Sequence, residues 1–364
     1  MEFSHIFNYK KFRITSLLGV FLFFSSIQVF ASTAINAVPH KVNSANSEEK
    51  FDPTVTILEH ISDTHSWHII GHTTIELPVI LFTQNGLDVF SSSNLVNEHH
   101  EAVAYNSGKN TYLNKAEHIK ILATDGKIDE EATLKLYDFS ITKNVTAMFI
   151  AVIAILLVFT SVAGAYKKRA GLAPKGLQSF AEPLIIFIRD DIARPNIGYK
   201  YEKFMPLLLT IFFFIWFNNL LGLIPIFPGS ANVTGNIAVT MVLAAIVLVV
   251  VNLNGNKYYW SHIFKPDVPF WLLPIMWIVE IIGVFSKPFA LMIRLFANIT
   301  AGHIIVLSLI SLIFIFKTLA IAPVSVAFVL FMYVLELLVS FLQAFIFTML
   351  TALFIGTAVE EHHH

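Results

Sequence analysis

Two long apolar segments near the C-terminus constrain the fold of this chain more than any other feature. As helices that rise about 1.5 Å per residue, residues 270–316 would measure roughly 70 Å and residues 323–359 roughly 55 Å. The hydrocarbon core of a bilayer is only about 30 Å thick. Each segment must therefore cross the membrane at a steep tilt or break into shorter pieces, and the first carries a helix-breaking residue at Pro288.

The composition places the chain among integral membrane proteins. Of 364 residues, 55% are hydrophobic and only 13% are charged, which is typical of membrane proteins rather than soluble domains. Because the sequence has no cysteine, a disulfide framework, a cysteine-ligated zinc site and a thiol nucleophile are excluded. The net charge of −1 and the lack of a basic patch give no reason to expect a nucleic acid partner.

Further membrane helices are predicted at three shorter apolar segments, 145–165, 205–225 and 237–253. Together with the two long segments they give five spans. Basic residues follow the first and third of these, at Lys167, Lys168, Arg169, Lys257 and Lys265. The positive-inside rule makes these connections cytoplasmic, so the N-terminus lies outside and the C-terminus inside. Leu177–Ile192 is expected to form an amphipathic surface helix, and Asn218 and Asn219 to form hydrogen bonds between helices.

Residues 1–31 are typical of a secretory signal sequence. Lys10, Lys11 and Arg13 supply a positive start, Ile14–Phe30 supplies an apolar run, and cleavage is expected after Ala31. The alternative is an uncleaved first span. In both cases the following region is delivered outside the cytoplasm. The expected organisation is a signal peptide (1–31), an extracytoplasmic region (32–140) and a membrane domain (141–361).

The extracytoplasmic region is predicted to hold a small β-rich cap. Ser32–Lys50 has few large apolar residues and is expected to be disordered. Residues 51–140 contain short alternating runs, with turns predicted at Asn85-Gly86 and Asp125-Gly126. Asp63 lies among four histidines, His60, His65, His68 and His72. Metal binding is one interpretation, but the spacing matches no known metal-binding pattern, so solvated or packed histidines are favoured.

Four ionisable residues interrupt the apolar segment 270–316: Glu280, Lys287, Arg294 and His303. On a helix the first three lie seven residues apart and form one polar stripe, which Asn298 joins, while His303 points to the opposite flank. The alternative to a function is that Lys287 snorkels and Arg294 forms a structural ion pair with Glu280. Because charges inside membranes are costly and arginine cannot neutralise, four such residues in one helix favour a function.

The last apolar segment carries a second polar face. Glu336, Ser340 and Gln343 are spaced by four and three residues, so they share one side of a helix. A polar seam between two membrane helices is the alternative to a functional site. A histidine and an acid brought together in a membrane can pass protons, because histidine titrates near neutral pH.

Three motifs connect these residues with a known family. The runs RLFANITAGH (294–303), SKPF (286–289) and LQAFIFTML (342–350) occur in the order and spacing of subunit a of the F-type rotary ATP synthase, which the chain resembles from Thr142 to its C-terminus. The resemblance implies an all-α polytopic membrane protein whose last two helices are long and strongly tilted. In that family one helix carries an acid and the other a histidine; here His303 and Glu336 hold these positions, exchanged relative to some members.

The resemblance also implies a function. The chain would be a non-catalytic, proton-conducting stator subunit that forms two half-channels against the rotating c-ring. Protons would pass His303 and Glu336, Arg294 would separate the half-channels, and Glu280 would line the cytoplasmic exit. The remaining residues expected along the path are Asn298, Ser340 and Gln343.

Implied partners are the c-ring, the peripheral-stalk b subunits, the other ATP synthase subunits and membrane lipid, in a bacterial inner membrane. No cofactor or metal is implied. Two alternatives from other classes are weaker. A secondary transporter is expected to show matching halves, which the sequence lacks. An intramembrane protease needs a serine nucleophile with a base, and Ser261-His262 is predicted to lie in a loop.

Overall fold

A computed structural model describes residues 57, 61–70, 73–97, 102–115, 117–168, 172–224, 229, 231–266, 268–316, 318 and 321–360. The predicted signal sequence, the segment 32–50, His60 and His72 lie outside the described residues. The chain divides into two compact units. The first extends to Ala147 and includes the short stretches 224–231 and 314–317, and the second comprises the remaining residues.

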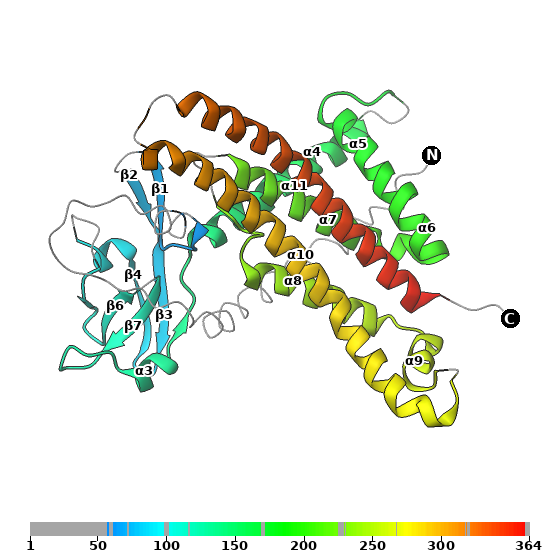
Figure 1. Cartoon of the computed structure of the whole chain (residues 1–364), viewed down its shortest axis with the longest axis horizontal. Helices are drawn as coiled ribbons and strands as arrows, with labels where there is room; N and C mark the ends of the chain where they lie inside the picture. The colour runs from blue at the N-terminus through cyan, green and yellow to red at the C-terminus, as the bar shows by residue number, and fades with distance from the viewer. Residues whose placement is uncertain are drawn as a thin grey trace. The chain divides into compact units, whose positions relative to one another are not determined.

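The first unit is built from short antiparallel strands (Figure 1). The described residues form three sheets, with orders β1-β2, β4-β3-β8 and β5-β6-β7. The strands are β1 (Ser66–Ile70), β2 (Thr73–Glu76), β3 (Pro78–Thr83), β4 (Gly86–Ser91), β5 (Tyr105–Asn106), β6 (Thr111–Lys115), β7 (His118–Leu122) and β8 (Tyr137–Asp138). The 3-10 helix Ser92–Leu95 and the helix α3 (Glu130–Leu134) lie between them. The region expected to be β-rich therefore does form strands.

Buried and exposed side chains alternate along the strands, and the buried ones form a small core. The side chains of Val79 and Leu81 on β3 are fully buried, and the core cluster also contains Leu95, Tyr112, Ile119 and Ile121. The predicted hairpin at Asn85-Gly86 joins β3 to β4, with Gly86 at a positive φ of 108° that favours glycine. The second predicted hairpin, at Asp125-Gly126, forms its turn, but a single β-bridge, Leu122 to Ile128, joins its two arms. The arms stay short because Asp129 caps α3 and ends the extended chain.

A buried ionic network surrounds His65. Its Nδ1 lies 3.1 Å from Glu117 Oε2, and its Nε2 lies 3.9 Å from Asp138 Oδ2. Burial alone would lower the pKa of His65, but the Asp138 and Glu117 carboxylates outweigh burial and raise it to about 9. His65 is therefore a packed, ion-paired histidine. Among the described residues, no group of three His, Asp or Glu side chains is arranged to hold a metal ion.

The same network holds the first turn of a long apolar helix, α4 (Lys143–Lys168). Asp63 accepts hydrogen bonds from the Thr142 hydroxyl (2.9 Å) and the Asn144 backbone amide (3.0 Å). The backbone amide of Lys143 donates to the carbonyl of Thr64 at 3.0 Å. The start of α4 is thus fixed to the strand region by side-chain and backbone hydrogen bonds.

The second unit is helical. After α4 it contains α5 (Leu177–Phe187), a π-helical stretch (Ile188–Ala193), α6 (Arg194–Ile197), α7 (Tyr201–Leu223), α8 (Ile237–Leu253), α9 (Lys257–Phe264), α10 (Leu273–Phe316) and α11 (Ala322–Val359). The predicted spans fall on α4, α7, α8, α10 and α11. The loop predicted for Ser261-His262 is wrong: both residues lie in α9, whose partial amphipathic character the surrounding charges had obscured.

Among the described residues, four helical stretches are long and apolar enough to span a membrane, and a fifth is obtained if α8 and α9, bent by 101° at their junction, count as one. One of the four runs from Leu177 to Leu223, where short π-helical and 3-10 segments connect α5, α6 and α7. Within it, Ile188 and Ile192 on the π-helical stretch are fully buried. The surface helix predicted at 177–192 therefore buries its apolar face inside the second unit.

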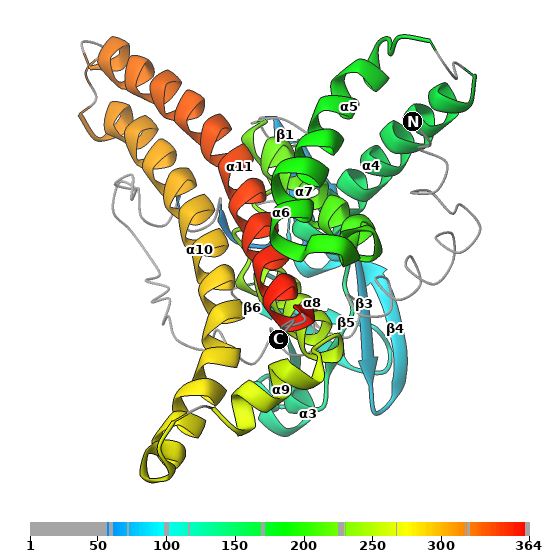
Figure 2. The same cartoon turned by 90° about the vertical axis from the view of Figure 1, so that its right-hand side faces the viewer.

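The helix α10 continues past Pro288, so the alternative of two short pieces is wrong. Helices α10 and α11 run side by side in opposite directions (Figures 1 and 2), as three contacts along their length demonstrate. Ser325 Oγ donates to the Leu309 carbonyl, His303 lies beside Glu336, and Lys287 Nζ lies 5.7 Å from the Phe354 ring centre. At roughly 66 Å and 57 Å both helices exceed the thickness of a bilayer core.

Aromatic and small residues pack α11 against its neighbours. Phe341 on α11 meets Phe212 on α7 edge-on, with ring centres 5.7 Å apart. Near the end of α11, a Cβ built on Gly356 would lie 1.9 Å from the backbone carbonyl oxygen of Asn196 on α6. Only glycine permits this approach without a backbone shift. The lower part of α11 is therefore closely packed, while Figure 2 shows α10 standing apart from α5 and α6.

Candidate functional site

A histidine and a glutamate meet between α10 and α11. His303 Nδ1 lies 3.8 Å from Glu336 Oε1, and the two side chains are 19% and 11% exposed. They line a small cavity with residues of three helices: Asn219, Leu223, Asn298, Ile299, Val339 and Ser340. The structure thus brings together four of the seven residues predicted for the site, namely Asn298, His303, Glu336 and Ser340.

Gly302 belongs to this site, although the sequence patterns did not single it out. A Cβ built on Gly302 would lie 2.5 Å from Glu336 Oε1. Without a side chain at this position, the carboxylate of Glu336 has room beside α10. The signal in the sequence was a glycine directly before His303 inside a helix, where glycine is otherwise unfavourable.

The helix α7 closes the cavity from a third side. Asn219 is buried, and its amide Nδ2 donates to the Ser340 carbonyl on α11 at 3.4 Å. Its Oδ1 accepts a hydrogen bond from the Thr234 hydroxyl. The hydrogen bond between helices predicted for Asn219 is confirmed, whereas Asn218 donates within its own helix to Phe214. Gln343, also predicted for the site, is buried beyond the cavity wall.

The three charges of the predicted stripe on α10 are separated from one another. Arg294 is exposed, and within the described part of the chain it has no carboxylate within ion-pair distance. Glu280 Oε1 lies instead 3.7 Å from His262 Nδ1. The alternative of a structural Arg294–Glu280 ion pair is therefore wrong, because 14 helical residues separate the two by roughly 21 Å.

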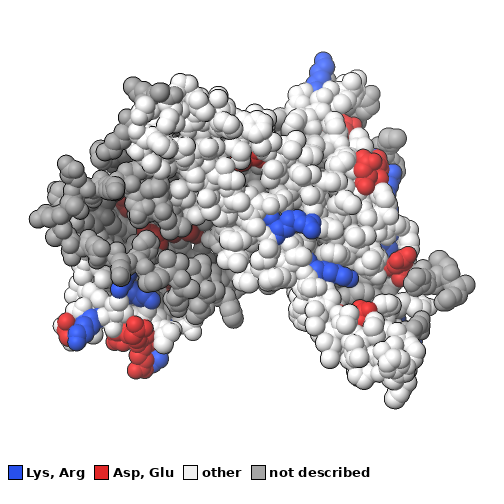
Figure 3. All heavy atoms as spheres, viewed as in Figure 1, with Lys and Arg blue, Asp and Glu red and all other residues white. Residues whose placement is uncertain are grey.

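The exposed charges of α10 lie within a surface that is otherwise largely uncharged. Figure 3 shows a broad uncharged surface over these helices, interrupted by Lys or Arg atoms near the middle of α10. Large apolar side chains are exposed along both helices, among them Ile282, Phe285, Phe289, Leu330, Val334 and Leu338. In water such a surface would be unstable, so it requires lipid or another apolar partner.

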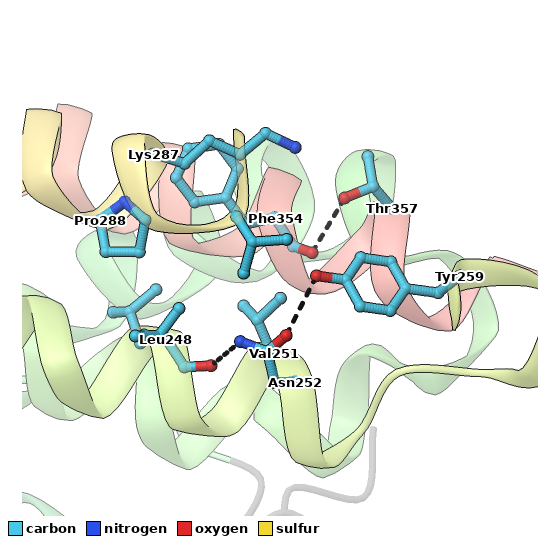
Figure 4. A pocket seen from close by; sticks show the side chains of 10 residues that line it. Leu248, Val251, Asn252, Tyr259, Lys287, Pro288, Phe354 and Thr357 are labelled. Atoms are coloured by element: carbon cyan, nitrogen blue, oxygen red, sulfur yellow. Dashed lines mark hydrogen bonds between the residues drawn. The ribbon is translucent and has the colours of Figure 1, made fainter. Parts of the chain in front are cut away.

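A second cavity lies between α8, α9, α10 and α11 (Figure 4). Its walls are mostly apolar, but Asn252, Tyr259, Lys287 and Thr357 contribute polar groups. The Tyr259 hydroxyl donates to Asn252 Oδ1 at 3.3 Å, and the Lys287 ammonium lies above the Phe354 ring. This cavity lies toward the Glu280 end of α10, opposite the His303 end.

The arrangement around His303 suits proton exchange. The 3.8 Å separation is too long for a direct hydrogen bond, so a water molecule or a small rotation must complete the connection. Glu336 Oε1 is buried and has no hydrogen-bond partner among the described residues. A carboxyl and an imidazole in such a place can take up and release protons in turn.

Comparisons with known proteins identify relatives for most of the chain. Residues 145–356 match the family described as ATP synthase A chain, and residues 56–139 match a domain of unknown function. The chain is 52% identical to ATP synthase subunit a of Chloroherpeton thalassium over 63% of its own length and 69% of that protein. It is 50% identical to ATP synthase subunit a 2 of Chlorobaculum tepidum, covering 61% and 64% of the two chains. Identity to subunit a of Myxococcus xanthus is 44%, over 62% and 75%.

Proposed function

The chain belongs to the ATP synthase A chain family, and from this membership and the site on α10 and α11 we propose that it is the proton-conducting stator subunit of an F-type ATP synthase. It is a multi-pass membrane protein. In this proposal two half-channels end at the surface of α10, where a ring of small hairpin subunits rotates past Arg294. The subunit carries protons and performs no catalysis by itself.

The observation that carries the proposal is the exposed Arg294, which has no carboxylate partner among the described residues and lies on an apolar helix that also holds His303. Nine helical residues separate them, roughly 13.5 Å along the axis. A permanent positive charge on a membrane-facing surface is costly unless a carboxylate or water meets it. A carboxylate on a neighbouring rotating subunit is the partner that this position requires.

The proton path follows from the chemistry of these groups. A proton taken up by the His303–Glu336 pair passes to a carboxylate of the ring. The neutral carboxyl group can then face lipid, because burying it costs far less than burying the ion. When it comes back to Arg294, the positive charge stabilises the ionised form and favours release of the proton. Glu280 lines the outlet, and each proton contributes about 2.3 kcal/mol per 100 mV of membrane potential.

The proposal assigns partners to the exposed surfaces. The apolar sides of α10 and α11 face the c-ring and membrane lipid, and the other helices contact the peripheral-stalk b subunits and remaining subunits of the complex. The location is the bacterial inner membrane, with the N-terminus outside and the C-terminus in the cytoplasm. The basic residues at the ends of the first and third spans support this orientation.

Replacement of Arg294 by alanine in the assembled complex tests the proposal. We expect ATP synthesis driven by an imposed proton gradient to be abolished, and passive proton leak through the membrane sector to increase. Lys168→Ala is the matched control, because it removes one exposed positive charge from the end of another membrane helix. Near-normal synthesis in the Arg294→Ala complex, at normal assembly, would refute the proposed function.

A further inference from the structure

A second histidine–glutamate pair lies at the end of α10 remote from His303. His262 on α9 and Glu280 on α10 approach to 3.7 Å, almost the same separation as His303 and Glu336. The two pairs differ in access to solvent. The His303 and Glu336 side chains are 19% and 11% exposed, whereas His262 is 72% and Glu280 is 25% exposed. The second pair therefore combines an accessible imidazole with a partly enclosed carboxylate.

The position of His262 is fixed by contacts at both ends of α9. Before the helix, the Asn256 backbone amide donates to the Ala358 carbonyl, and its side chain donates to the Val359 carbonyl, each at 2.8 Å. At the other end, Trp277 Nε1 on α10 donates to the Phe264 carbonyl at 2.8 Å. Because α9 is hydrogen-bonded to both long helices, the fold itself positions His262 beside Glu280.

Polar groups continue from this pair toward the interior. Tyr259 lies within electrostatic reach of Glu280, and its hydroxyl donates to Asn252 in the cavity of Figure 4. Lys287 lines the same cavity, two helical turns beyond Glu280 on the stripe that leads to Arg294. The charged residues Glu280, Lys287 and Arg294 thus lie at intervals of about two turns along α10, leading from the pair to the exposed arginine.

Other titratable groups lie near this end of α10. The described elements carry Lys257, Tyr258 and Lys265 on and beside α9, Lys203 on α7, and Glu360 after α11. Lys203 Nζ is held by Asn254 Oδ1 at 2.6 Å. Among the described residues, Glu280 is the group within ion-pair distance of His262. An exchange of protons at His262 is therefore directed to Glu280.

We propose that His262 is the proton-exchanging partner of Glu280 at the cytoplasmic port, so that α10 has a His–Glu pair at each end. This deepens the proposed function and rests on it. During synthesis the Glu280 carboxyl group loses its proton to the neutral imidazole of His262, directly or through one water. The resulting imidazolium releases that proton to bulk water, and Glu280 remains as carboxylate. During hydrolysis-driven pumping the same proton moves in reverse.

The test uses the complete complex in inverted membrane vesicles, whose cytoplasmic face is outside. ATP-driven acidification of the lumen is measured while the external pH varies from about 6 to about 9, which brackets the ordinary pKa of histidine. For His262→Gln we expect the alkaline limb of the pumping profile to shift toward lower pH by about one unit, because Glu280 must collect protons alone. Glu280→Gln should shift it as well, and the double variant no further than Glu280→Gln.

Two controls separate a proton-exchange role from a structural one. Ser261→Ala, at an exposed neighbouring position of α9, should leave the profile unchanged. A structural role of His262 predicts equal loss at all pH values. Such uniform loss, or an unshifted profile in a complex whose pumping still requires Arg294, would overturn the inference and leave the proposed function standing. Normal pumping by Arg294→Ala would instead refute the proposed function itself.

A second measurement still tests the inference if the His262→Gln complex assembles poorly. The chain has no cysteine, so His262→Cys introduces the only thiol of this subunit. A membrane-impermeant maleimide should label it in inverted vesicles and leave it unlabelled in right-side-out vesicles. Labelling confined to right-side-out vesicles would place α9 on the wrong side and overturn the inference.

Discussion

Gly302 and Glu336 are in direct contact between α10 and α11, so closely that a Cβ on Gly302 would lie 2.5 Å from the Glu336 carboxylate oxygen. The neighbouring atom is the end of a flexible side chain and not backbone, so a larger residue at 302 moves the carboxylate without breaking the helix packing. The glycine therefore sets where the acid of the His303–Glu336 pair lies.

Gly302→Ala should assemble normally but slow proton-driven ATP synthesis roughly tenfold or more, because small misplacements of reacting groups are costly. Shortening the acid in Gly302→Ala with Glu336→Asp should recover part of the rate. Gly283→Ala is the control, since a Cβ at this glycine of α10 meets no atom within 4 Å. Equal rates for the alanine variants at 302 and 283 would contradict the assigned role of Gly302.

Exchange of the pair tests whether His303 and Glu336 act together. His303→Ala should slow synthesis while the complex still assembles, because proton uptake loses one of its two groups. The double variant His303→Glu with Glu336→His should be more active than either single exchange, since it restores a histidine and an acid at the two facing positions. A double variant no better than its worse parent would show that the two residues do not act as a pair.

Arg294→Lys should fail in coupled synthesis almost as completely as Arg294→Ala. Lysine keeps a positive charge, but it lacks the forked guanidinium and can lose its proton when it is desolvated. Rates of ATP synthesis under an imposed gradient, normalised to the amount of assembled complex, provide the measurement. Substantial activity in Arg294→Lys would mean that any positive charge suffices at this position.

The packing of α11 on α6 gives a prediction about stability. Gly356→Ala should destabilise the subunit by about 1–3 kcal/mol, because its Cβ meets the backbone carbonyl of Asn196 and one helix must move. The measurement is the thermal unfolding of the purified complex, with Gly283→Ala as the control in open space. An unchanged unfolding temperature for Gly356→Ala would show that the helices adjust without cost.

The buried His65 makes the strand region sensitive to pH. Its pKa of about 9 lies above the value of about 6.5 expected for the unfolded chain. The stabilisation by protonated His65 is therefore complete below about pH 6.5 and is lost as the pH rises through about 9, at most about 3 kcal/mol. The pKa values of Glu117 and Asp138 are lowered despite burial, chiefly by His65, so their contribution is present at neutral pH and lost in acid.

Hydrogen exchange of the backbone amides of β1 and β7 in the intact complex measures this effect. Protection should decrease between about pH 6.5 and about pH 9, after correction for the intrinsic pH dependence of exchange. His65→Gln should lower protection at neutral pH and remove the additional loss. His118→Gln is the control, because His118 has no ion pair within 4 Å among the described residues. Identical profiles for His65→Gln and the native chain would contradict the prediction.

Periodicity and hydropathy predicted the long helices well, because membrane spans depend on local composition. The limits of α8 at Ile237 and Leu253 match the predicted ones. Whether α10 breaks at Pro288 was open, since its continuity depends on neighbouring helices that satisfy the backbone. Contacts between residues far apart in the sequence were harder to predict. Spacing alone placed Arg294 and Glu280 on one stripe, but it gave no means to foresee that α9 turns by 101° and brings His262 to Glu280.

The contact between Ser325 and the Leu309 carbonyl has a consequence for the alignment of the two long helices. A slip of α11 by one turn, about 5.4 Å, would place Met332 or Ser340 opposite His303 in place of Glu336. Neither replacement is an acid, so every neighbouring alignment leaves the histidine without its carboxyl partner. The hairpin of α10 and α11 thus has a single alignment that pairs the histidine with its acid, and the distant contact of Ser325 with Leu309 helps to maintain it.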